Sequence, residues 1–128
     1  MSLRSPLGRV LGLGSAKDGS HHWWMQRVSS VALVLLSIWF GVALLTRGAL
    51  DYASLIDWMN GPINATLLVL LIVTVTYHSA LGVQVVLEDY VSHKGAKLLS
   101  LIANQFVHLT LGAIGVFAIL RVAFGSAA

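Results

Sequence analysis

The 128-residue sequence contains no cysteine and few charged residues, and both absences narrow what the protein can be. Without cysteine, this chain forms no disulfide, carries no thiolate nucleophile and supplies no cysteine ligand to zinc or to an iron–sulfur cluster. Charged residues make up 10% of the sequence, whereas a water-soluble domain has about a quarter. Together with 57% hydrophobic residues and a mean hydropathy of +0.83, this composition indicates a membrane protein.

Several motifs of soluble enzymes and binding domains are missing as well. The sequence has no glycine-rich phosphate loop, no H-E-x-x-H and no G-x-S-x-G. The net charge is +3, but the Lys and Arg residues are scattered along the chain, which argues against a nucleic-acid-binding face. The chemistry of the protein therefore has to come from residues in or beside its apolar segments.

Three long apolar runs predict an all-α integral membrane protein with three transmembrane helices. The predicted spans are residues 28–45, 63–87 and 98–122. Pro62 is typical of the start of a helix, because its fixed φ and missing N–H are tolerated in the first turn. None of the runs shows the period-two alternation of a barrel strand. The chain then divides into an N-terminal arm at 1–27, a membrane anchor at 28–122 and a short tail at 123–128.

The Lys and Arg residues predict the orientation of these helices. Six lie on one side of the membrane and two on the other: Arg4, Arg9, Lys17, Arg27, Lys94 and Lys97 against Arg47 and Arg121. Positive loops favour the inside, so the N-terminus is predicted to be cytoplasmic and the C-terminus periplasmic. The first 17 residues contain Arg and Ser and no acid, so a transit peptide is an alternative to a cytoplasmic arm.

Two segments beside the spans are predicted to lie at the membrane surface. Residues 51–60 gather apolar side chains in a pattern typical of a short interfacial helix, namely Leu55, Ile56, Trp58 and Met59. Trp23 and Trp24, just before the first span, are typical of interfacial anchors.

Two histidines lie deep within apolar runs, where an ionisable side chain is costly and functional by default. His78 is in the second span and His108 in the third. For each residue, heme ligation, proton relay and a hydrogen bond to a neighbouring helix are all open. Near His78, Gly82 would let a flat macrocycle or another backbone approach, and the Thr74 hydroxyl could orient the imidazole.

An acidic and a phenolic side chain stand at the cytoplasmic end of the second span. Asp89 follows His78 by eleven residues, about 1100° of helix, so the two side chains are predicted to share a face about 16 Å apart. Tyr90 could donate a hydrogen bond to a carbonyl, or could serve as an ordinary interfacial aromatic residue. Asp89 could deliver protons or orient Tyr90, or could be a solvated charge at the helix end.

Polar residues also stand at the start of the first span. Arg27 is expected to reach the lipid headgroups or to hold an anionic group, and His21 could join it. Ser29 and Ser30 either face a quinone-sized pocket or bond back to their own helix. We expect His108 to be structural, with a bond to Asn104 on its own helix face.

Two motifs together resemble the small hydrophobic D-type membrane anchor of succinate dehydrogenase, the respiratory complex II. One is H-x10-D-Y at His78, Asp89 and Tyr90, and the other is H-x5-R at His21 and Arg27. The three-helix layout and the predicted orientation agree with this family, and the N-terminal arm resembles its alphaproteobacterial branch. The resemblance spans nearly the whole chain and implies a bacterial inner-membrane location, with the mitochondrial inner membrane as the alternative.

The resemblance implies roles for these residues and partners for the chain. His78 would be an axial ligand of heme b, Tyr90 would bind ubiquinone with Asp89 in support of quinone reduction, and His21 and Arg27 would lie near the heme propionates. A C-type cytochrome b anchor subunit would supply the second axial histidine. A flavoprotein subunit and an iron–sulfur subunit would dock on the cytoplasmic face, so that this chain itself would make no contact with succinate and would have no activity alone.

Two other functions remain open from the sequence. A membrane scaffold or assembly protein would use His78 and His108 for hydrogen bonds between helices, without a cofactor. A cytochrome b anchor of a fumarate reductase would bind heme in a similar way but would work with menaquinone.

Overall fold

The computed structural model describes residues 17–48 and 51–125, and the regular structure in these ranges is helical. The helices are α2 (Lys17–Leu45), α3 (Tyr52–Asn60), α4 (Pro62–Tyr90) and α5 (Lys94–Gly125). Three of them, α2, α4 and α5, are long and apolar enough to cross a membrane, so the predicted fold class is confirmed. Arg4 and Arg9 of the predicted arm and residues 126–128 of the predicted tail lie outside the described residues.

The long helices extend beyond the apolar runs that predicted them. Helix α2 begins at Lys17, so the last part of the predicted 1–27 arm is helical. The three helices have 29, 29 and 32 residues, which corresponds to about 44 to 48 Å of helix. A hydrocarbon core of about 30 Å is shorter than this, so the helix ends project into the headgroup region or the helices tilt.

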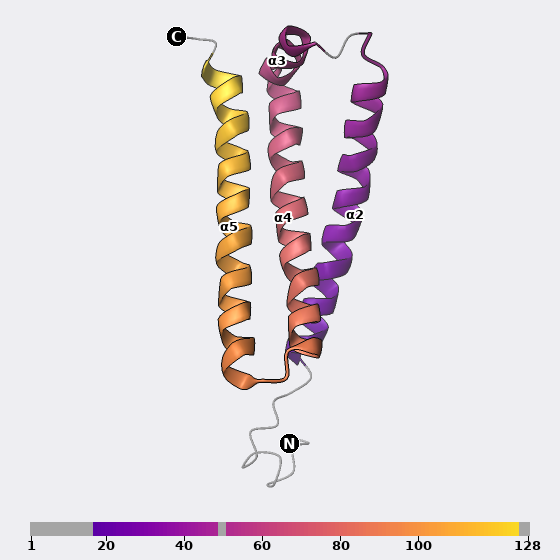
Figure 1. Ribbon diagram of the computed structural model, residues 1–128. Coiled ribbons are helices and arrows are strands. Elements are labelled where there is room, and N and C mark those ends of the chain that lie inside the picture. Colours follow the sequence, from indigo (N-terminus) through magenta and orange to yellow (C-terminus); the bar gives the residue numbers. More distant parts are fainter. Residues whose placement is uncertain (1–16, 49–50, 126–128) are drawn as a thin grey trace.

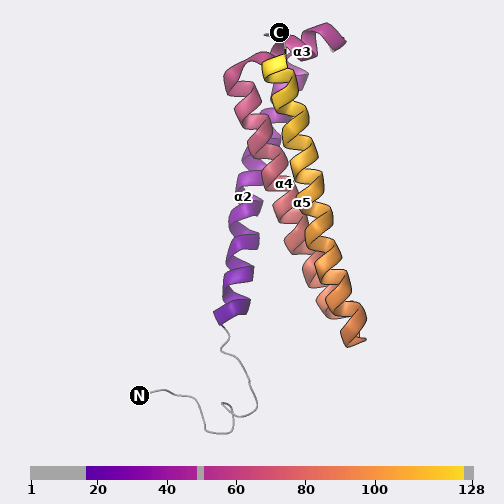
Figure 2. The same ribbon diagram turned by 90° about the vertical axis from the view of Figure 1, so that its left-hand side faces the viewer.

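Helix α4 is the central element of the bundle. It packs most extensively against α5 and next against α2, whereas α2 and α5 do not pack against each other within the described ranges. Figures 1 and 2 show α4 and α5 side by side along their length, while α2 crosses α4 obliquely. The start of α2 and the α4–α5 turn lie at one end of the bundle, and α3 and the end of α5 lie at the other (Figure 1).

The short helix predicted at 51–60 is confirmed as α3, and its ends have identifiable causes. Asp51 caps its N-terminus by accepting hydrogen bonds from the Ser54 hydroxyl (2.9 Å) and the Ser54 backbone N–H (3.2 Å). These two bonds hold the pKa of the Asp51 carboxyl below its usual value, and the bond from the Ser54 hydroxyl has the larger effect. At the other end, Gly61 ends α3 and caps α4, and Pro62 occupies the first turn of α4 as predicted.

An aromatic cluster fastens α3 to the neighbouring long helices. The Trp39 ring of α2 stacks on the Trp58 ring of α3 with centroids 5.9 Å apart. The Arg47 guanidinium lies 5.4 Å from the Trp58 centroid and donates to the Ser54 carbonyl at 2.8 Å. From α4, the Asn64 amide donates to the Trp58 carbonyl at 2.9 Å. Helix α3 is therefore packed against both α2 and α4.

Two glycines allow the close approach of α5 to α4. A Cβ built on Gly115 would lie 2.7 Å from Cγ2 of Ile72, and one on Gly112 would lie 3.2 Å from Oγ1 of Thr76. Without a hydrophobic driving force inside lipid, this kind of close backbone packing is what holds membrane helices together. The α4–α5 pair therefore depends on the absence of side chains at these positions.

Gly115→Ala is expected to lower the free energy of unfolding by about 1–3 kcal/mol, the usual effect of overpacking. Cγ2 of Ile72 branches directly from Cβ, so it can move aside only if Ile72 leaves its preferred helical rotamer or the backbone shifts. Gly41→Ala is the matched control, because a Cβ at Gly41 meets nothing within 4 Å and alanine favours a helix. Thermal unfolding of the purified protein in detergent measures both variants, and equal midpoints would contradict the packing argument.

Candidate functional site

The site forms around His78, where α2 crosses α4. The His78 Nδ1 atom lies 3.0 Å from the Ser29 hydroxyl, and its Nε2 atom lies 3.4 Å from the Gln26 amide nitrogen. Ser29 is one of the few buried polar residues in the described ranges, with 7% of its surface exposed. The imidazole of His78 is thus held at both nitrogens by side chains from another helix.

With the Gln26 amide nitrogen against Nε2, the hydrogen-bond pattern favours the tautomer of His78 that carries its proton on Nδ1. The Ser29 hydroxyl donates its one proton to the Gln26 carbonyl at 3.1 Å, so it accepts the bond from His78. The proton is then on Nδ1, and Nε2 has a bare lone pair that accepts a bond from the Gln26 amide. A neutral imidazole with one nitrogen anchored and the other bare is the form that binds a metal.

The orienting hydroxyl comes from a different helix than the sequence predicted. Thr74, one turn before His78 in α4, was a candidate to orient the ring, but the bond is made by Ser29 of α2. The second alternative given for Ser29 also holds, since it bonds back to the Gln26 carbonyl. Ser30 makes only such a back-bond, with its hydroxyl 2.7 Å from the same carbonyl.

Gly82 provides space on the same side of α4. The nearest atom to a Cβ built there is the Gln26 amide nitrogen, at 3.7 Å. The Gln26 side chain therefore lies over Gly82 and against Nε2 of His78, and its Oε1 atom is buried without a hydrogen-bond partner. Sequence reasoning did not identify Gln26, although its four-residue spacing from His22 and three-residue spacing to Ser29 mark one face of α2.

The structure does not bring His21 and Arg27 together. Both side chains are exposed, and no hydrogen bond or ion pair joins them in the described part of the chain. The Arg27 guanidinium instead lies 5.3 Å from the centroid of Trp23. Six residues correspond to about 600°, which leaves the two side chains about 120° apart around the helix. It is His22 that shares the face of Gln26 and Ser29, with its Nε2 buried and without a partner.

His108 has a different environment, on the α5 side of α4. Its Nδ1 atom lies 2.9 Å from the Asn104 carbonyl, which confirms the expected bond to Asn104, through the backbone. Its Nε2 atom lies 3.1 Å from the Ser79 hydroxyl of α4. Both nitrogens of His108 are therefore engaged in bonds within the chain.

Asp89 and Tyr90 end α4, which is continuous from His78 as the angular argument requires. Both side chains are exposed, Tyr90 to 83%. The neighbouring Glu88 accepts a bond from Gln84 at 2.8 Å through its carboxylate, and one from Lys97 at 2.5 Å through its backbone carbonyl. Hydrogen bonds therefore hold this end of α4 in place, while the side chains of Asp89 and Tyr90 are exposed.

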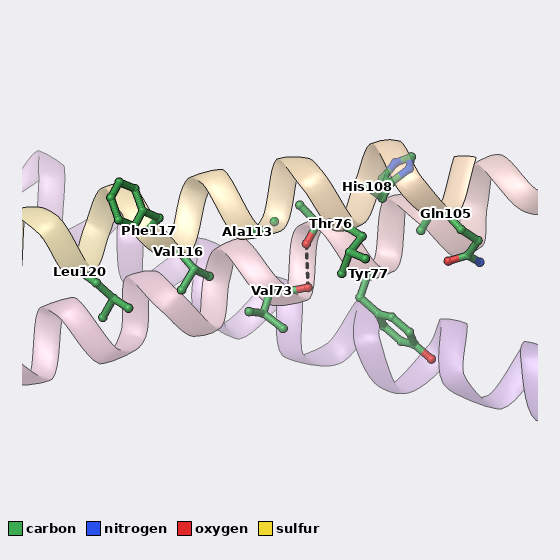
Figure 3. Close-up of a pocket in the computed structure, with 12 residues that line it drawn as sticks. Val73, Thr76, Tyr77, Gln105, His108, Ala113, Val116, Phe117 and Leu120 are labelled. Atoms are coloured by element: carbon green, nitrogen blue, oxygen red, sulfur yellow. Dashed lines mark hydrogen bonds between the residues drawn. The ribbon is translucent and has the colours of Figure 1, made fainter. Parts of the chain in front are cut away.

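A groove of about 570 Å³ runs between α4 and α5, on the opposite side of α4 from the His78 contacts. Figure 3 shows His108 and Phe117 from α5 and Thr76 from α4 along it, with Tyr77 directed away from α5. Its lining is mainly apolar, and its polar groups include Thr76, whose hydroxyl bonds back to the Ile72 carbonyl at 2.7 Å. The groove gathers no set of groups that suggests chemistry.

Comparisons with known proteins agree with the sequence and the fold. The sequence profile of the succinate dehydrogenase/fumarate reductase transmembrane subunits matches residues 1–118. A succinate dehydrogenase hydrophobic membrane anchor subunit of Rickettsia conorii is 40% identical over 100 residues, which cover 77% of this chain and 79% of the relative. The protein of the same name from Rickettsia bellii is 40% identical over 89 residues, 70% of this chain and 71% of the relative.

A more distant relative covers almost the entire chain. The succinate dehydrogenase hydrophobic membrane anchor subunit of Paracoccus denitrificans is 27% identical over 122 residues, 95% of this chain and 94% of the relative. The three apolar helices agree with the name of membrane anchor that these relatives carry. The chain belongs to the family of succinate dehydrogenase/fumarate reductase transmembrane subunits, among the hydrophobic membrane anchors of succinate dehydrogenase.

Proposed function

We propose that this chain helps bind heme b and ubiquinone in a succinate:ubiquinone oxidoreductase of the bacterial inner membrane. The observation that carries the proposal is the geometry of His78: its Nδ1 atom lies 3.0 Å from the Ser29 hydroxyl, and among the described residues its Nε2 atom contacts only a side-chain amide, at 3.4 Å. An imidazole held in this way is prepared for a metal. At His108, by contrast, Nε2 is engaged by the Ser79 hydroxyl in a bond that joins two helices.

The residues around His78 fit a heme. Heme b, when bound, supplies a one-electron redox centre. His78 would provide one axial ligand through Nε2, and the Gln26 side chain is flexible enough to give way, since its amide makes no other bond. Gly82 leaves the adjacent surface of α4 without a side chain. The other axial ligand is proposed to come from a C-type partner subunit.

Arg27 and His21 are proposed to interact with the heme propionates. Both lie within the first turns of α2, toward the end of the bundle that carries Asp89 and Tyr90. Arg27 makes no ion pair with the described residues, so its guanidinium is available for charge-assisted hydrogen bonds to carboxylates. Because the two side chains lie on different faces of α2, they would contact different carboxylate groups.

Tyr90, supported by Asp89, is proposed to bind the quinone. The exposed phenol can donate a hydrogen bond to a quinone carbonyl, and the adjacent carboxylate can orient it or pass protons. The Gln84–Glu88 and Lys97–Glu88 bonds keep this helix end ordered. Since these side chains point away from the bundle, the rest of the pocket would come from the C-type subunit and the iron–sulfur subunit, with the flavoprotein subunit beyond.

His78→Ala in the co-expressed complex is expected to remove the b-type heme absorbance or to shift it markedly, because one axial ligand is lost. A reduced-minus-oxidised spectrum of the purified complex measures this. An unchanged spectrum would overturn the heme assignment. Extraction of the bound quinone from the unaltered complex distinguishes ubiquinone from the menaquinone of a fumarate reductase.

Ser29→Ala is expected to weaken heme binding by roughly 10–100-fold, as loss of a group that orients a metal ligand usually does. Ser30→Ala is the matched control, because Ser30 bonds only to its own helix. Transfer of heme from each purified complex to an apoglobin gives the rate of heme loss. Equal rates for the two variants would show that the Ser29–His78 bond does not support ligation.

Tyr90→Phe is expected to reduce succinate–quinone turnover by roughly fivefold or more, the effect of losing a hydrogen bond worth about 1 kcal/mol. The heme content should stay near normal. Tyr77→Phe serves as the control, since Tyr77 is on the same helix and makes no hydrogen bond to a described residue. Undiminished turnover in Tyr90→Phe would make Tyr90 an interfacial aromatic residue only.

A further inference from the structure

Helix α5 forms hydrogen bonds to α4 at Ser79 and Ala80, the two residues that directly follow His78. The Asn104 amide donates to the Ala80 carbonyl at 3.0 Å, and Nε2 of His108 lies 3.1 Å from the Ser79 hydroxyl. Asn104 and Ala80 are each only 7% exposed. We call these four residues, Ser79, Ala80, Asn104 and His108, the clasp.

The protonation pattern of the clasp follows from its acceptors. The Asn104 carbonyl can only accept, so Nδ1 of His108 carries the proton and donates to it at 2.9 Å. Nε2 of His108 is then bare and accepts the bond from the Ser79 hydroxyl. This bond engages the one nitrogen of His108 that could have bound a metal.

The Asn104 amide has only one favourable orientation. Its nitrogen bonds to the Ala80 carbonyl while its oxygen is buried without a partner. The reversed amide would set two acceptors against each other and lose the bond. Asn104 therefore fixes the position of one particular carbonyl of α4, at a buried site where lipid cannot replace the bond.

Because consecutive residues of a helix are about 100° apart, holding Ser79 and Ala80 against α5 determines where His78 points. A side-chain tip lies about 5–6 Å from the helix axis, so a rotation of α4 by about 10° moves it by about 1 Å. Ligand sites tolerate only about 0.5 Å of misplacement. The glycine contacts at Gly112 and Gly115 set the distance between the helices, whereas the directional bonds of the clasp set the rotation.

We infer that Asn104 and His108 are positioning residues for His78: through Ala80 and Ser79 they fix the rotation of α4 and so aim Nε2 of His78. The inference rests on the proposed role of His78 as a heme ligand. It assigns to α5, which contributes no ligand, the task of setting the ligand geometry.

The test uses Ser79→Ala, His108→Leu and Asn104→Leu in the purified complex. The measurements are the low-field g value of the oxidised heme by electron paramagnetic resonance and the heme midpoint potential. Each variant is expected to keep its heme but to shift both quantities, because the axial imidazole is tilted. His108→Gln should restore the parent values, since its amide oxygen can accept the Ser79 hydroxyl bond.

Gly115→Ala is the control for a loss of α4–α5 packing, because the new Cβ meets Ile72, about two turns of α4 before Ser79 and Ala80. It is expected to lower thermal stability without shifting the heme signals. If the clasp variants behave like Gly115→Ala, the positioning role is overturned.

His78→Ala separates the two proposals. Heme retained in that variant refutes the ligand assignment. Heme lost in that variant, together with an unshifted g value and midpoint potential in Ser79→Ala, refutes only the role of the clasp. Ser79→Ala removes one exposed hydroxyl, so it is the variant least prone to misfold.

Discussion

A bilayer core offers no hydrogen bonds, so every polar side chain within it has to find its partner inside the protein. In this chain those partners converge on one stretch of α4. Ser29 of α2 holds His78, and Asn104 and His108 of α5 hold Ala80 and Ser79. These bonds lie on opposite sides of α4, which explains why α4 is central and why α2 and α5 do not pack against each other in the described ranges.

The same bundle has little apolar core of its own. Four apolar residues are buried, and no large side chain is fully buried among those described. Lipid satisfies most of the exposed apolar surface, so burial alone gives no reason for a particular helix arrangement. Glycine contacts and interhelical hydrogen bonds must supply that specificity.

The sequence predicted the features that depend on local pattern. Hydropathy identified the three spans, the 51–60 pattern identified α3, and the four-residue spacing identified the His108–Asn104 bond. Contacts between helices could not be predicted from the sequence, because they depend on the rotation and register of one helix against another. The sequence therefore suggested Thr74, a neighbour on the same helix, as a partner of His78, whereas Ser29 makes the bond and Gln26 was missed. The pairing of His21 with Arg27 was predicted from the H-x5-R motif alone. Helical spacing instead places His22 on the same face of α2 as Gln26 and Ser29.

The two intramembrane histidines differ in a way that supports His78, and not His108, as the proposed ligand. Both lie at similar depth, and in both the bond at Nδ1 leaves Nε2 bare. The two histidines differ in the chemical group that lies against Nε2. At His108 it is a hydroxyl at 3.1 Å that joins two helices, so displacing it would break the α4–α5 contact. At His78 it is a flexible amide at 3.4 Å that joins nothing else, so an incoming ligand can replace it while Ser29 still holds the ring.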